Sequence, residues 1–295
     1  MYATLIVVAA LWGATAGLLV PRAAYRLSVH PEERWRDSCE AGHALVGPAR
    51  GWLGGPGCAA CADRTPGDRT PGDRTPGVRS VGTASAESTA HPGPQPAPPH
   101  PAPPHPAPPS LGPSLSSRLT PSLLTALACA ALAAVTGPRP ELAVWLLYAP
   151  FAVLLATVDV RVHRLPDQLT LPLAAATPLL LLGAELLPYD AGSWLHALLG
   201  GLALGGGYLV LFLIHPNGMG LGDVKLALSL GSALGWYGWG ILFVGAFSGF
   251  LLGSLYGLGL VLARRGSRKS AIPFGPFMIG GALFGVLMGA FVATP

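Results

Sequence analysis

The sequence predicts an all-α membrane protein, a polytopic bundle of about eight transmembrane helices with a disordered, proline-rich cytoplasmic insert. Charged residues make up only 11% of the 295 residues, whereas soluble domains usually contain roughly 25%. The apolar residues are also clustered, because from Leu119 onward long apolar blocks alternate with short polar breaks. Blocks of about 17–25 apolar residues are long enough to cross a bilayer as helices.

The first apolar block covers residues 1–20 and predicts an N-terminal transmembrane helix. No basic residue precedes it, whereas Arg22 and Arg26 follow it. Basic residues after a first span mark a stop-transfer segment whose N-terminus lies outside. We therefore favour an uncleaved helix over a cleaved signal peptide.

The segment after this helix is polar and divides into two parts. Residues 21–61 form a short cytoplasmic insert, and residues 62–118 form a low-complexity linker. Asp-Arg-Thr-Pro-Gly repeats between Asp63 and Gly77, and variants of Pro-Ala-Pro-Pro-His run from Pro96 to Ser110. Proline at this density prevents helix formation, and too few apolar side chains remain to form a core. The linker is therefore predicted to be disordered.

Residues 119–295 form the predicted membrane domain. Its apolar blocks lie at Leu119–Thr136, Glu141–Val158, Gln168–Leu187, Trp194–Ile214, Val224–Gly235, Trp239–Ala263 and Pro276–Ala293. The block that begins at Val224 is short for a span, so we expect it to tilt or to continue through Trp236. In the last two blocks glycine recurs at every fourth residue, which predicts close helix packing. These glycines are Gly245, Gly249, Gly253 and Gly257, then Gly281, Gly285 and Gly289.

The basic residues of the loops predict the topology. If the N-terminus is outside, the only basic residue of an outside loop is Arg139, and all the others fall inside. Such asymmetry follows the positive-inside rule and supports eight spans with both termini outside. The inside residues of the membrane domain are Arg161, Arg164, Lys225, Arg264, Arg265, Arg268 and Lys269. They are scattered without interleaved aromatic residues, so we expect the partner to be a bilayer and not a nucleic acid.

Acidic residues at the ends of the predicted spans are the candidates for chemistry, because an ionisable group at a membrane span is costly. Asp159, Asp167 and Asp223 fall at the inside boundary. Three others, Glu141, Glu185 and Asp190, fall near the outside boundary, where we expect them to reach water.

Asp223 has the most informative surroundings. It follows three alternate glycines, Gly218, Gly220 and Gly222, and Lys225 comes two residues later. Glycines keep the backbone thin, so an extended peptide could approach the carboxylate. The alternative is a plain helix N-cap.

Asp159 lies at the end of an apolar helix, where a negative charge opposes the helix dipole. The local structure gains nothing from it, which favours a functional interpretation over an ion pair with Arg161 or Arg164. Asp167 begins the next helix and is expected to be its N-cap. It is also a reserve candidate for the first functional acid.

Three motifs resemble those of the type IV prepilin peptidases. Gly220-Leu-Gly-Asp-Val-Lys-Leu226 is similar to the family's GxGD motif, and Asp159 with Arg164-Leu-Pro-Asp167 is similar to its first aspartate segment. Ile272-Pro-Phe-Gly-Pro-Phe277, which contains Pro273 and Gly275, is similar to a late signature of the family. The resemblance implies that Asp159 and Asp223 form a catalytic pair. It also implies that Gly218, Gly220, Gly222, Lys225, Pro273 and Gly275 bind substrate or shape the loops.

The insert departs from the family pattern. Larger members carry two Cys-x-x-Cys pairs there, which resemble a zinc site. Here Cys58 and Cys61 form one such pair, and only Cys39 with His43 could replace the other. We favour a remnant without metal, so no cofactor is expected. The insert is associated in the family with N-methylation, and we leave that activity, with the S-adenosylmethionine it would require, open.

The resemblance implies an aspartic endopeptidase of the bacterial plasma membrane that acts at the cytoplasmic side on a prepilin or pseudopilin precursor. Two close carboxylates would share one proton and activate water. The alternatives are an ion-coupled transporter or channel, whose intramembrane acids relay ions, and an inactive scaffold for pilus assembly.

Overall fold

The computed structural model describes residues 2–29, 33–39, 41–54, 58, 61, 115–216, 218–263 and 273–293. Most of the predicted linker lies outside the described residues, as do the basic residues 264–269 and Ile272. The side chains of residues 115–118 are also outside the described part of the structure.

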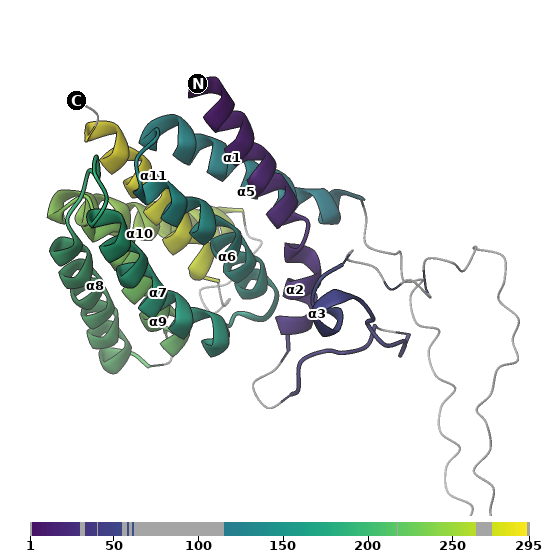
Figure 1. Cartoon of the computed structure of the whole chain (residues 1–295). Helices are drawn as coiled ribbons and strands as arrows, with labels where there is room; N and C mark the ends of the chain where they lie inside the picture. The colour runs from purple at the N-terminus through teal and green to yellow at the C-terminus, as the bar shows by residue number, and fades with distance from the viewer. Residues whose placement is uncertain are drawn as a thin grey trace, which may run out of the picture. The chain divides into compact units, whose positions relative to one another are not determined.

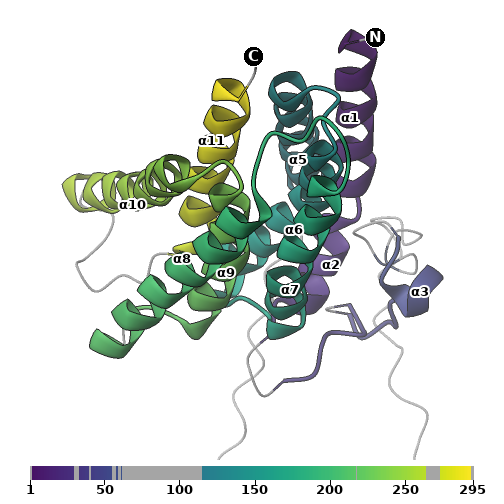
Figure 2. The same cartoon turned by 60° about the vertical axis from the view of Figure 1, so that its left-hand side comes forward.

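All the described regular elements are helices (Figure 1). Their bounds are α1 Tyr2–Gly17, α2 Val20–Leu27, α3 Pro48–Gly51, α5 Leu115–Thr136, α6 Glu141–Val162, α7 Asp167–Glu185, α8 Trp194–Ile214, α9 Leu221–Gly235, α10 Trp239–Leu262 and α11 Gly275–Val292. The start of α1 and the end of α11 lie at the same end of the bundle, and α10 runs across the direction of α11 (Figure 2). The all-α polytopic membrane fold is therefore confirmed.

Seven helical segments of the described chain are long and apolar enough to cross a membrane, with α1 and α2 counted together as Tyr2–Leu27. The predicted short block forms α9, which has 15 residues and does not meet that measure. Helix α9 contacts α7, α8, α10 and α11, and its residues from Leu226 to Gly235 are almost all buried. Because protein surrounds α9, its length need not match the thickness of the bilayer.

The N-terminal helix extends further than the sequence predicts. After a short break it continues as α2, in which Arg22 and Arg26 are buried. Arg22 Nε donates to the carbonyl oxygen of Gly51 at 2.8 Å, and Arg26 Nη1 donates to that of Arg50 at 3.1 Å. The Arg26 guanidinium also lies 4.4 Å from the centre of the Trp52 ring. The arginines predicted as a topology signal thus also attach the insert to α2.

Helix α1 is bonded to α6 at a proline. Pro150 has no N–H, so the carbonyl oxygen of Leu146 lacks its usual partner within the helix. The indole N–H of Trp12 donates to that oxygen at 2.9 Å. In an apolar environment an unsatisfied carbonyl is costly, so this bond fixes α1 against α6.

The predicted glycine stripes pack α10 against α11. A Cβ atom added at Gly281 would lie 2.6 Å from the carbonyl oxygen of Gly245, and one added at Gly285 would lie 2.9 Å from the Cα atom of Gly245. A second such contact, which the sequence analysis did not identify, joins α8 to α9. There a Cβ atom at Gly200 would lie 2.7 Å from the Gly231 carbonyl oxygen.

The α10–α11 contact gives a stability prediction with a matched control. In Gly281→Ala the new methyl group meets the backbone of α10, and overpacking of this kind costs about 1–3 kcal/mol. In Gly280→Ala, one residue away, the nearest atom is Leu252 Cδ1 at 3.7 Å. Thermal unfolding in detergent should show a lower midpoint for Gly281→Ala and a nearly unchanged one for Gly280→Ala. Equal midpoints would contradict the close contact.

Candidate functional site

Asp159 is buried in the last turn of α6, with a relative exposure of 4%. The backbone N–H of Gly275, the first residue of α11, donates to Asp159 Oδ2 at 2.9 Å. A Cβ atom at position 275 would lie 2.8 Å from the same oxygen, so only glycine leaves room for the carboxylate. Asp159 has no ion pair with Arg161 or Arg164 among the described residues.

Asp223 lies in the first turn of α9 and is partly buried. It is not the N-cap, because Gly220 holds that position. Instead the N–H of Gly220 donates to Asp223 Oδ2 at 3.3 Å. The glycines of this motif pack closely, since a Cβ atom at Gly222 would lie 2.9 Å from Leu165 Cβ. One at Gly218 would collide with the ring of His215.

The two acids come from different motifs, yet Asp159 lies close enough to Asp223 to interact with it electrostatically. The start of α9, which carries Asp223, is also held by an ion pair to the start of α7. Lys225 Nζ lies 2.7 Å from Asp167 Oδ1, an ion pair between the starts of α9 and α7. The N-cap role predicted for Asp167 is wrong, because Pro166 is the N-cap of α7 and Asp167 is its first residue. The ion pair explains this acid without a direct part in chemistry.

An aromatic cluster adjoins Asp223, and the sequence analysis missed it. Tyr208 of α8 is 3% exposed and lies within electrostatic range of Asp223. Its ring stacks on Phe250 at 5.5 Å between centroids and lies 6.3 Å from Phe274. Phe274 follows the half-buried Pro273 and directly precedes Gly275. The late signature thus contributes an aromatic wall as well as the bond to Asp159. No period or spacing in the sequence indicates that Tyr208 faces the acids.

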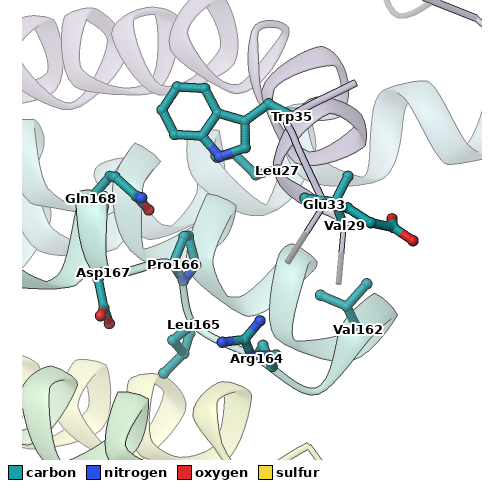
Figure 3. A pocket seen from close by; sticks show the side chains of 10 residues that line it. All are labelled: Leu27, Val29, Glu33, Trp35, Val162, Arg164, Leu165, Pro166, Asp167 and Gln168. Atoms are coloured by element: carbon teal, nitrogen blue, oxygen red, sulfur yellow. The ribbon is translucent and has the colours of Figure 1, made fainter. Parts of the chain in front are cut away.

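A polar pocket of about 230 Å³ lies beside the loop between α6 and α7 (Figure 3). Arg164, Leu165 and Asp167 of that loop form one side of it, and Glu33 and Trp35 of the insert form another. The loop that carries part of the first aspartate motif therefore lies next to the insert.

One acid at the opposite end of the bundle differs from expectation. Glu141 was expected to reach water but is fully buried. Arg139 Nη1 lies 3.7 Å from Glu141 Oε1, and Arg139 Nη2 donates to the Ala290 carbonyl oxygen at 3.0 Å. The α5–α6 turn is thus covered by the end of α11, which a prediction from span boundaries alone does not foresee.

The insert brings candidate metal ligands together. Ser38 pairs with Ala44, and the tight turn between them places Cys39 Sγ 3.6 Å from His43 Nδ1. The ligand atoms of Cys39, His43 and Cys58 lie within 4.8 Å of one another. Cys61 follows Cys58 at the Cys-x-x-Cys spacing.

The thiolates of Cys39 and Cys58 and the imidazole of His43 are donors of the kind found in structural zinc sites. The arrangement therefore fits zinc better than the metal-free remnant that the sequence analysis favoured. Bound there, the ion would fasten the Cys39–His43 turn to Cys58 near the end of the insert.

Comparison with known proteins identifies relatives. Residues 146–262 match the Type IV leader peptidase family. The chain is similar to the prepilin leader peptidase/N-methyltransferase of Aeromonas salmonicida, with 35% identity over 164 residues that cover 53% of each protein. It is also similar to leader peptidase HopD of Escherichia coli, with 33% identity over 140 residues, 45% of this chain and 84% of that protein.

The chain spans about half the length of its Aeromonas relatives. A further relative, the prepilin leader peptidase/N-methyltransferase of Bacillus subtilis, is 31% identical over 173 residues, 57% of this chain and 64% of that protein. No solved structure matches the chain.

The zinc ligands give a prediction that metal analysis can check. The purified full chain should contain about one zinc ion per molecule, as four-coordinate structural sites do. Cys58→Ser should lose most of the zinc and lower the midpoint of thermal unfolding. Cys129→Ser is the matched control, because Cys129 is buried within α5, far along the chain from the insert. Zinc content near zero in the unmodified protein would contradict the assignment.

Proposed function

Since the chain belongs to the type IV leader peptidase family, we propose that it is an aspartic endopeptidase of the bacterial plasma membrane. Its substrate is a type IV prepilin or pseudopilin precursor, from which it removes the leader peptide. Asp159 and Asp223 are the proposed catalytic residues. The observation that best supports this role is that two separate motifs bring Asp159 close enough for its charge to act on Asp223.

The proposed mechanism requires the two carboxyl groups to act as one unit. Close carboxylates do not both ionise readily, so the pair retains one proton. The ionised carboxylate removes a proton from water, and the water oxygen attacks the scissile carbonyl carbon. The protonated carboxyl group donates to the carbonyl oxygen. The C–N bond then breaks, and the leaving nitrogen receives a proton from the pair. Either acid can take either part.

Neighbouring groups hold the acids for this chemistry. The N–H of Gly275 donates to Asp159, and that of Gly220 donates to Asp223. The ion pair of Asp167 with Lys225 fixes the two helix starts that flank the site. These residues are positioning residues in the proposal, because they act through the two acids or through the loops that carry them.

The position of the acids suits a precursor with a short basic leader and an apolar helix. If that helix lies in the bilayer, its junction with the leader lies at the membrane edge. Asp159 is in the last turn of α6 and Asp223 is in the first turn of α9, so both belong to helix ends. The basic residues of the same loops favour the cytoplasmic side.

The same position argues against an ion-coupled transporter. Transporter sites usually lie near the bilayer midplane, whereas these acids lie at helix ends. An inactive scaffold for pilus assembly can be distinguished from a peptidase only by measuring cleavage of a precursor. N-methylation, which the names of the Aeromonas and Bacillus relatives include, stays outside the proposal.

The central prediction concerns the two acids. Purified protein should cleave a pilin-like precursor in detergent or in membranes, and Asp159→Asn or Asp223→Asn should lower kcat by at least about 10²–10⁴-fold, the usual contribution of general acid–base catalysis. The kcat of the double variant should be no lower than that of the less active single variant, because the pair acts as a unit. The readout is the release of the leader measured by mass spectrometry.

Glu185→Gln, near the other end of α7, is the control and should cleave normally. If both aspartate variants cleaved at the unmodified rate, the proposed site would be wrong.

A second prediction tests the ion pair. Lys225→Gln or Asp167→Asn should lower kcat by about 2–5-fold, because exposed pairs contribute about 0.2–1 kcal/mol. Asp167→Lys combined with Lys225→Asp should restore part of the loss, since the reversed charges can still pair. If each residue instead acted independently of the other, the charge-reversed double variant should have a lower kcat than either single variant.

A further inference from the structure

An apolar groove of about 680 Å³ runs along α6 at the end of the bundle that carries Asp159. One wall is formed by Ala16 and Ala23 of the N-terminal helical segment. The floor includes Leu147, Phe151 and Leu154 of α6. Almost all its lining atoms are apolar, and the proposed chemistry does not use it.

The groove continues into two smaller hollows. Leu147, Phe151 and Leu169 also line an apolar hollow of about 200 Å³ between α6 and α7. At the other end, Leu27 and Trp35 are shared with the polar pocket of Figure 3. The combined surface is therefore apolar along the helices and polar at the membrane edge.

Cations gather at the polar end. Leu147, Leu154 and Arg161 are spaced by seven residues and so share one face of α6, which places Arg161 beyond the end of the groove. Arg161 lies close enough to Arg36 for the two guanidinium groups to repel each other. Arg164 lines the polar pocket. None of these arginines takes part in an ion pair within the described part of the chain.

The acids near this end do not neutralise the arginines. Asp167 is paired with Lys225, and Glu33, which lines the same pocket as Arg164, forms no ion pair with it among the described residues. Like charges without counter-charges are unfavourable, so the arrangement favours an anion from outside the chain.

We propose that the groove binds an anionic phospholipid, with an acyl chain along α6 and the phosphate beside Arg161 and Arg164. A bilayer is as apolar as the groove, so preference for one lipid must come from its headgroup. Basic pockets between helices at a membrane edge bind anionic lipid headgroups in this way. A precursor helix fits the groove less well, because its basic leader would meet the arginines.

Tryptophan fluorescence can test this proposal in the full chain without substrate. Trp12, Trp35 and Trp52 line the groove, and bromine atoms on an acyl chain quench tryptophans that they contact. The protein is placed in phosphatidylcholine nanodiscs that contain increasing fractions of brominated phosphatidylglycerol or brominated phosphatidylcholine. Half-maximal quenching should need a fraction of brominated phosphatidylglycerol about fivefold or more below that of brominated phosphatidylcholine. Each arginine near an anionic headgroup strengthens binding by about that factor.

Two variants locate the lipid. Arg161→Gln with Arg164→Gln should abolish the preference for phosphatidylglycerol, and Arg50→Gln, an exposed arginine of the insert, is the matched control. Ala23→Leu should fill the groove and reduce quenching by both lipids, whereas Ala3→Leu on the exposed start of α1 should not.

Equal quenching by the two lipids in the unmodified protein would overturn the proposal. So would a preference that survives the double arginine variant, or quenching that Ala23→Leu leaves unchanged. Protection of the tryptophans by a pilin-like precursor, without a preference among lipids, would assign the groove to the substrate instead. Because no cleavage is measured, failure here leaves the proposed peptidase activity untouched.

Discussion

The candidate site depends on the burial of an acid at the place where the end of α6 meets the start of α11. Asp159 at the end of α6 is almost inaccessible to water, and its described hydrogen bond comes from the backbone of Gly275 at the start of α11. A buried carboxylate without partners would be costly. Backbone N–H groups can supply such partners only if no side chain intervenes, which explains glycine at this position. The N–H of Gly220 likewise donates to Asp223, although a Cβ atom at Gly220 would make only ordinary contacts.

Helix α9 carries the second acid, and contacts with other helices rather than with the bilayer determine its position. Its close approach to α8 at Gly200 and Gly231 leaves no room for side chains between the backbones. In lipid, where apolar burial gives little net attraction between helices, such backbone proximity is a main source of association. The position of Asp223 within the bundle is therefore fixed by packing, and a helix of 15 residues suffices.

Much of this arrangement could be predicted from the sequence because its signals are local. Apolar blocks gave most helix bounds to within a few residues, and the four-residue glycine period predicted the contact of α10 with α11. The candidate acids were identified from their position at block ends and from neighbouring glycines.

Features that depend on contacts between distant segments could not be predicted in this way. Tyr208 comes within electrostatic range of Asp223 through the packing of α8, and the end of α11 bonds to the turn that precedes the buried Glu141. For the same reason, the sequence suggested possible ligands in Cys39 and His43 but not their closeness, which the Ser38–Ala44 pairing creates.

The attachment of the insert to α2 has a consequence for substitutions in the insert. Arg22 and Arg26 donate to main-chain oxygens of Gly51 and Arg50, and every amino acid carries such an oxygen. Contacts of this kind tolerate substitution at positions such as Arg50, as long as the backbone keeps its course, whereas Gly51 has a positive φ and no room for a side chain. Side-chain changes at such positions in the insert are therefore expected to disturb its attachment less than changes of the two arginines.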